Sequence, residues 1–260
     1  MFPKFLEKNS KKYNYFYYYV PFVIGFFTSF SLPPYNYTFI NFITFTYLLI
    51  LLLSAKMTEC GNKIFFFIGW FFGLGFFLSS LYWISISLTH DNLFKILIPF
   101  SLIIIPSFLA TFYGIATLIL KRFVTPKISF ILIFSLVFAF IEYLRGNILG
   151  GFPWNLFAYS WSWSIDVIQC IKIVGTYGFN LLSITIFSFP FIFFIKIKKI
   201  NIIKSFTILF TIVYVIWIFG STISPKKINS DVNDFTIKIV SPNIELYEFF
   251  KRNNDSKTIN

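Results

Sequence analysis

The residues of this chain best suited to chemistry lie between positions 142 and 159, where a carboxylate and a guanidinium interrupt a series of apolar segments. Glu142 and Arg145 are three residues apart, so a helix places them on one face. An ionised side chain deep in a bilayer costs about 2.5–3.5 kcal/mol on insertion scales, so both should pair, reach the interface or face water. Two roles stay open for them: contact with a lipid headgroup or a second domain, and a structural pair that closes the helix end.

The loop after this pair combines helix-breaking residues with aromatic residues. Gly146, Gly150, Gly151 and Pro153 predict that the helix ends here. The amphipathic rings that follow favour a membrane–water interface, and they are Trp154, Tyr159, Trp161 and Trp163. The pattern predicts a helix that surfaces into a loop lying at the membrane face, with the tryptophans as interface anchors or as substrate contacts.

The composition sets the class of protein. The chain is 57% hydrophobic, 40 of its 260 residues are Phe, and 12% are charged, whereas soluble domains have roughly 25% charged residues. This much apolar surface predicts an integral membrane protein. The net charge of +12 comes in short clusters between apolar runs, which indicates topology signals and argues against a nucleic-acid partner.

Seven apolar segments are each near the roughly 20 residues that a helix needs to cross a bilayer. They cover about residues 14–31, 37–54, 64–88, 94–120, 128–145, 176–195 and 203–222. The third contains Gly69, Gly73 and Gly75, small residues that allow close approach of another helix.

The loops between these segments differ in charge. Alternate loops, beginning with the N-terminus, hold thirteen basic residues, and the opposite loops hold three: Lys95, Arg145 and Lys172. By the positive-inside rule, the N-terminus is cytoplasmic, and the loop after Arg145 and the C-terminal tail face outward.

The tail differs from the rest of the chain. Residues 223–234 form a polar linker, and residues 236–240 alternate between apolar and polar side chains as a strand does. One strand cannot form a domain, because its edges have no partner. We therefore expect a transmembrane helical domain over 1–222, and a linker with the truncated start of another domain over 223–260.

The two cysteines, Cys60 and Cys170, are far apart and match no disulfide framework or metal spacing. Cys170 has no base within a helical turn on its own face, and a thiol with an ordinary pKa of about 8.5 is largely protonated near neutral pH. We assign no catalytic residue, no metal ligand and no cofactor in these 260 residues.

Four stretches together resemble the bacterial apolipoprotein N-acyltransferases. They are EYLRG…GGFPW-x-x-x-x-Y with GTYGFNLLS at 175–183, SFSLPPYN at 29–36, GWFFGLGFFLSSLYWISISL at 69–88, and IKIVSPNI at 237–244. Their order and spacing agree over nearly the whole chain. The last is similar to the opening strand of that family's extracytoplasmic nitrilase-like domain, so the resemblance implies an all-α polytopic membrane protein followed by a truncated start of an α/β domain.

The resemblance implies acyl transfer from a phospholipid to the N-terminal diacylglyceryl-cysteine of a lipoprotein, in the bacterial inner membrane. The reaction passes through an acyl-cysteine and needs no metal or organic cofactor. The family's Glu-Lys-Cys triad lies in the nitrilase-like domain, and no position here matches it, so this chain alone is expected to be inactive. Candidates for contact with substrate or a lipid headgroup are Glu142, Arg145, Trp154, Tyr159, Lys172, Tyr177 and Asn180.

Two other functions stay open. One alternative is a non-catalytic membrane half of a split or decayed enzyme that works only with a separate nitrilase-like polypeptide, and the other is a small seven-helix transporter. A transporter should show ionisable residues near the middle of the membrane and internal repeats, and we see neither in the sequence.

Overall fold

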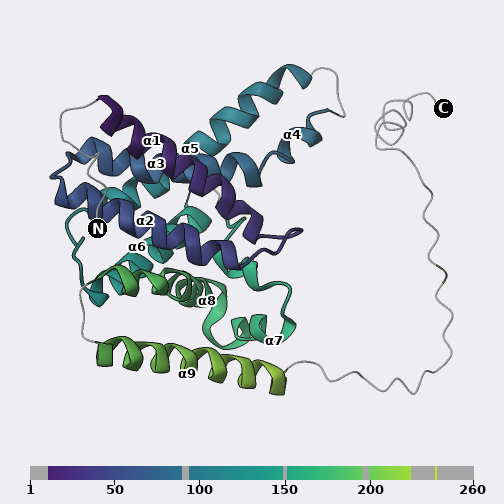
Figure 1. Ribbon diagram of the computed structural model, residues 1–260. Coiled ribbons are helices and arrows are strands. Elements are labelled where there is room, and N and C mark those ends of the chain that lie inside the picture. The colour runs from purple at the N-terminus through teal and green to yellow at the C-terminus, as the bar shows by residue number, and fades with distance from the viewer. Residues whose placement is uncertain (1–10, 90–93, 149–150, 196–198, 224–237, 239–260) are drawn as a thin grey trace.

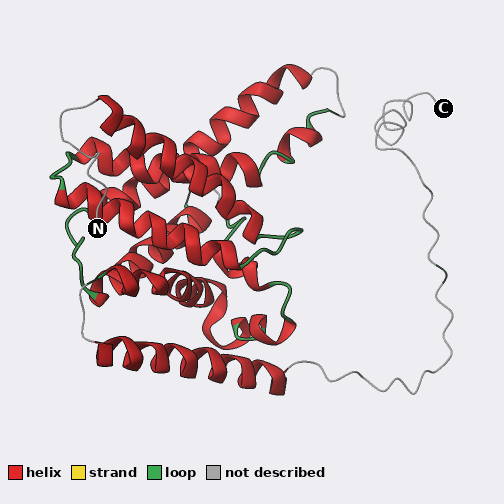
Figure 2. Ribbon diagram, viewed as in Figure 1, coloured by secondary structure: helices red, strands yellow, loops and turns green. Residues whose placement is uncertain are grey.

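The computed structural model describes residues 11–89, 94–148, 151–195, 199–223 and 238, with the backbone alone for 11–14 and 199. All regular structure in these residues is helical (Figure 2). The expected strand at 236–240 and the tail around it lie outside the described residues, apart from Lys238. So do His90 and Asp91.

The helices follow one another with short connections. In chain order they are α1 (Lys11–Thr28), η1 (Ser29–Ser31), α2 (Phe39–Met57), α3 (Asn62–Ser80), α4 (Ile84–Ser87), η2 (Lys95–Leu97), α5 (Ile98–Leu120), α6 (Ile128–Asn147), η3 (Phe157–Trp161), α7 (Ile165–Ile168), α8 (Ile171–Ser188), η4 (Phe189–Phe194) and α9 (Lys199–Ile223).

Six of the helical segments described are long and apolar enough to cross a membrane, one fewer than the seven expected. The difference is α1, whose 18 residues include Lys11, Lys12 and five tyrosines, which lower its hydropathy. This helix still packs along α3 within the bundle. The structure is thus an all-α polytopic membrane protein.

The bundle has two groups of helices (Figure 1). In the first group, α3 lies between α1 and α5; in the second, α8 packs against both α2 and α6. The packing of α5 against α6 joins the two groups. Helix α9 packs on α7 and leaves most of its apolar side chains exposed, as expected for a surface that faces lipid.

Close approach to α3 depends on its glycines. A Cβ atom on Gly69 would lie 2.1 Å from the carbonyl oxygen of Tyr113, and one on Gly75 would lie 2.1 Å from the carbonyl oxygen of Phe22. The glycines predicted to allow close helix contact therefore do so on two sides, Gly69 toward α5 and Gly75 toward α1.

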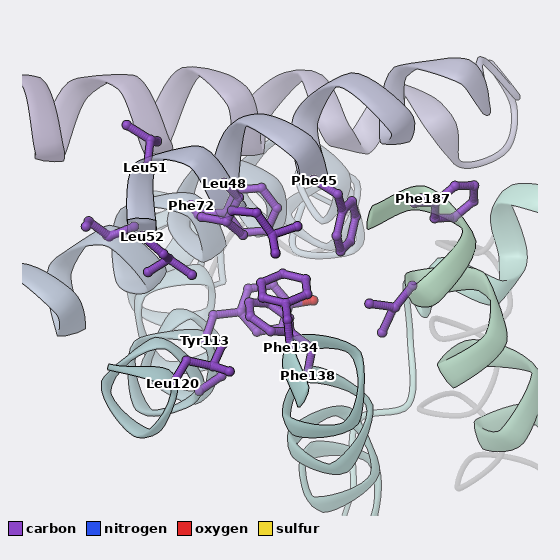
Figure 3. Close-up of a cluster of buried hydrophobic side chains, with 14 of the residues drawn as sticks. Phe45, Leu48, Leu51, Leu52, Phe72, Tyr113, Leu120, Phe134, Phe138 and Phe187 are labelled. Atoms are coloured by element: carbon purple, nitrogen blue, oxygen red, sulfur yellow. The ribbon is translucent and has the colours of Figure 1, made fainter. Parts of the chain in front are cut away.

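Aromatic rings from several helices fill the centre of the bundle (Figure 3). Phe134 and Phe138 of α6 stack with their centroids 4.5 Å apart, and Phe45 of α2 meets Phe157 edge to face at 4.8 Å. Tyr113 of α5 lies among these phenylalanines, 5.4 Å from the Phe138 ring. The core thus joins α2, α5 and α6 with the loop helix η3.

Hydrogen bonds identify the two ends of the bundle. At one end, Lys56 in the last turn of α2 donates to the carbonyl of Lys121 after α5, at 3.1 Å, and Lys121 donates to Asn62 at 2.6 Å. At the other end, Asn155 donates to Ser80 at the end of α3 (2.9 Å). The basic α2–α3 and α5–α6 connections therefore lie together, and the loop after α6 lies at the opposite end (Figure 1).

Candidate functional site

A buried charged cluster lies near the end of α6. Glu142 and Arg145 form an ion pair, and their residues are 0% and 1% exposed. Tyr113 of α5 donates its hydroxyl hydrogen to the other oxygen of Glu142. The Phe77 ring lies 5.1 Å from the guanidinium carbon of Arg145, which adds a cation–π contact. A buried ion pair is stable only when further hydrogen bonds satisfy both charges, and this cluster largely meets that condition.

Both terminal nitrogens of Arg145 bind the loop after α6, whereas its buried Nε has no hydrogen-bond partner among the described residues. Nη1 donates to the carbonyl of Phe152 at 2.6 Å, and Nη2 donates to the carbonyl of Trp154 at 3.0 Å. The loop can fold back because Gly151 has φ +74°, a conformation that side-chain-bearing residues rarely adopt. Arg145 therefore holds the backbone of the loop from inside the protein, and its guanidinium is not exposed to a headgroup in this conformation.

The other sequence candidates divide between the loop and α8. Asn180 is buried, and its Oδ1 accepts the backbone N–H of Ala158 at 3.0 Å, which links α8 to η3. The Tyr177 hydroxyl lies 3.5 Å from the Asn147 amide nitrogen and packs on Gly146. Tyr159 is half-buried, and that burial raises the pKa of its hydroxyl. Lys172 is exposed at the start of α8.

The loop and three neighbouring segments enclose a groove of about 940 Å³. Phe30 and Tyr35 line it from η1 and the following turn, Trp83 from the turn between α3 and α4, and Trp154 and Tyr159 from the loop. The Trp83 and Trp154 rings are 5.4 Å apart and are 43% and 52% exposed. None of the residues that line the groove, all within the described part of the chain, carries a formal charge. Such a lining suits an apolar chain.

Polar side chains that the sequence analysis did not single out hold the groove wall. Ser160 of η3 is buried, and its hydroxyl lies 3.1 Å from that of Ser31 and accepts from Asn41 at 2.9 Å. Its carbonyl accepts from Thr38 at 2.6 Å. Ser160 is more than 100 positions from each of these three partners in the sequence, so no local pattern predicts that they meet.

The two cysteines are poor nucleophiles in this structure. Both are buried. Cys170 points its sulfur toward the carbonyl of Ile216 in α9 (3.4 Å), and burial raises the pKa of its thiol, so the reactive thiolate is disfavoured. Among the described residues, no group of three or more His, Cys, Asp or Glu side chains is placed to hold a metal ion.

Residues 24–189 match the family model of the apolipoprotein N-acyltransferase N-terminal domain. The apolipoprotein N-acyltransferase of Brucella melitensis is 32% identical over 175 residues, which are 65% of this chain and 33% of that protein. That of Rickettsia prowazekii is 32% identical over 203 residues, 77% of this chain and 39% of that protein.

The chain thus spans about a third of the length of the curated relatives that it matches. The family match covers well over half of the chain and contains the buried pair, the loop and the groove. On this evidence, the chain belongs to the apolipoprotein N-acyltransferase family.

Proposed function

We propose that this chain forms the membrane domain of an N-acyltransferase that moves an acyl chain from a phospholipid to the N-terminal diacylglyceryl-cysteine of lipoproteins. The groove is the observation that carries the proposal, because it joins an apolar, uncharged lining to two partly exposed indoles. Indoles are typical of the membrane interface, where a phospholipid ester lies. The groove would hold an acyl chain while its ester stays near the surface.

The nucleophile of this reaction would come from a nitrilase-like domain, on the same or on a separate polypeptide. A cysteine thiolate there would attack the phospholipid ester and release a lysophospholipid, and the lipoprotein amine would then attack the resulting thioester. Cys170 suits this role poorly because burial raises the pKa of its thiol. Residues 1–222 would then serve as the membrane domain and 223–260 as the connection to the next domain.

We also propose the bacterial inner membrane as the location, with the N-terminus in the cytoplasm and the tail in the periplasm. The charge bias between the loops supports this orientation. The groove, at the end opposite to the basic connections, would then open toward the periplasm, where a lipoprotein substrate is presented.

An acyl-transfer assay tests the proposal. The chain, reconstituted in phospholipid vesicles with the nitrilase-like domain of a relative, should acylate a diacylated lipopeptide, and the chain alone should not. Trp83→Ala and Trp154→Ala should each lower the rate about tenfold, because each removes much of a large aromatic surface from the groove. Trp217→Ala on α9, outside the groove lining, is the matched control. Equal rates in all three variants, or turnover by the chain alone that Cys170→Ser abolishes, would contradict the proposal.

A further inference from the structure

Tyr113 places a hydroxyl where the surrounding side chains are apolar. Its ring lies 5.2 Å from that of Phe77 and 5.4 Å from that of Phe138, and the residue is fully buried. A phenylalanine would fill this volume equally well. Within the described part of the chain, the hydroxyl hydrogen-bonds to the carboxylate of Glu142 alone, so the contribution of this residue beyond packing passes through that carboxylate.

The contacts continue from Glu142 to the groove in two steps. Glu142 binds Nη2 of Arg145, and Arg145 binds the carbonyls of Phe152 and Trp154 through separate nitrogen atoms. Two donors on a planar fork fix both the position and the orientation of the backbone they bind. Trp154 is therefore held by its own carbonyl, and its ring lies beside that of Trp83 at the groove wall.

We propose that Tyr113 is a positioning residue for the groove. Its hydroxyl fixes Glu142, Glu142 fixes the Arg145 guanidinium, and the guanidinium fixes the loop backbone so that the Trp154 ring stands at the groove wall. This inference rests on the proposed function of the groove and assigns a task to a residue of α5 that does not line it. It also gives Glu142 and Arg145 a role in lipid binding without direct contact with a headgroup.

The geometry of the loop supports the proposal that the contacts from Tyr113 through Glu142 and Arg145 fix the Trp154 ring. Asn155, the residue after Trp154, has φ +61° and donates to Ser80 of α3 at 2.9 Å. The loop is therefore fixed on both sides of Trp154, by Arg145 before it and by Ser80 after it. Release of the Arg145 side would let the indole move while the rest of the loop stays attached.

Fluorescence quenching tests the inference without catalysis. The full chain is placed in vesicles of phosphatidylcholine that carries bromine atoms on its acyl chains, and quenching by bromine is compared with and without Trp154→Phe. The difference between the two quenching values is the contribution of Trp154 to the quenching. In a Tyr113→Phe background this contribution should fall by roughly twofold or more, because residues in one hydrogen-bond network couple. Arg145→Lys, which keeps the charge but loses the fork, should have the same effect.

Tyr17→Phe is the matched control. Tyr17 is also fully buried, and its hydroxyl lies 2.9 Å from that of Ser54 in α2, so this variant loses a comparable contact away from the groove. It should leave the Trp154 contribution unchanged. An equal Trp154 contribution in the unaltered chain, Tyr113→Phe and Arg145→Lys would overturn the positioning inference alone. No quenching of Trp154 in the unaltered chain would overturn the groove proposal itself.

Discussion

Glu142 and Arg145 stabilise each other only as a pair, because each is enclosed by the protein. Glu142→Leu would leave the guanidinium buried with two carbonyls and no counter-charge. Breaking a buried pair in this way costs about 3–5 kcal/mol, whereas replacing both partners with apolar residues of similar volume is often close to neutral. We expect Glu142→Leu to lower the free energy of unfolding by about that amount, measured by an unfolding titration in mixed detergent micelles.

The double variant Glu142→Leu/Arg145→Met is the control for this prediction. It should be more stable than Glu142→Leu alone, although it also loses the anchors of the loop. If the losses of unfolding free energy in Glu142→Leu and in Arg145→Met alone add up to the loss in the double variant, the pair contributes no coupling energy. The buried cluster would then not be the unit described here.

At the scale of single residues, the sequence predicts local relations and misses distant ones. The spacing of Glu142 and Arg145 predicts one helix face, and their pairing there is confirmed. Tyr113 and the carbonyl groups of the loop were not foreseen, because they come from another helix and from backbone atoms that carry no sequence signal. Likewise, the apolar stretch of α6 does not reveal which phenylalanines face the core: Phe138 is buried, and Phe140 is 59% exposed.

Among the elements, α3 has little room for added volume at its glycines. Ala in place of Gly69 would put its Cβ 2.1 Å from the Tyr113 carbonyl oxygen and 2.2 Å from the Thr117 hydroxyl oxygen. Because one of these atoms is backbone, α3 and α5 would have to separate, and overpacking of this kind costs about 1–3 kcal/mol. We expect a clearly lower unfolding temperature in detergent micelles for Gly69→Ala.

Gly61, which precedes α3, provides the matched control. No atom lies within 4 Å of a Cβ built there, and its φ of −69° suits any residue. Because Gly61 is the N-cap of α3, where Ala is less favourable than Gly, Gly61→Ala should cost about 0.5–1 kcal/mol and lower the unfolding temperature less than Gly69→Ala. Equal unfolding temperatures for the two alanine variants would mean that α3 and α5 are less tightly packed than the structure shows.

The helical elements themselves follow from apolar length, and their irregular ends follow from glycine and proline. The sixth predicted segment begins at about residue 176, and α8 is indeed interrupted at Gly175, whose φ is +70°. The prediction of seven spanning helices differs from the structure at α1, because an apolar count that includes tyrosine as hydrophobic overstates the hydropathy of that helix. The short helices α4, α7 and η3 were not predicted, since they are too short to show a periodicity and pack on other helices: α5, α9 and α8, respectively.

At the scale of the whole molecule, charge and groove lie at opposite ends. The α2–α3 and α5–α6 connections and the helix ends beside them hold Lys56, Lys63, Lys121, Arg122 and Lys127, and hydrogen bonds bring these connections together. The groove is uncharged, and its lining includes Ser80 and Asn155 at the other end. A bundle built in this way has one preferred orientation in a membrane, because positively charged loops remain in the cytoplasm during insertion.

This orientation gives a labelling prediction. In a chain whose two cysteines are replaced by serine, single cysteines are introduced by Asn147→Cys and Lys63→Cys, both at exposed positions. A membrane-impermeant maleimide should label Asn147→Cys in intact cells, because that residue ends α6 beside the groove loop. Lys63→Cys should be labelled only after the membrane is permeabilised, because it lies with the basic connections. The reverse pattern would place the groove in the cytoplasm, away from lipoprotein substrates. Labelling of both positions from one side would mean that α3 and α6 do not run through the membrane as the bundle requires.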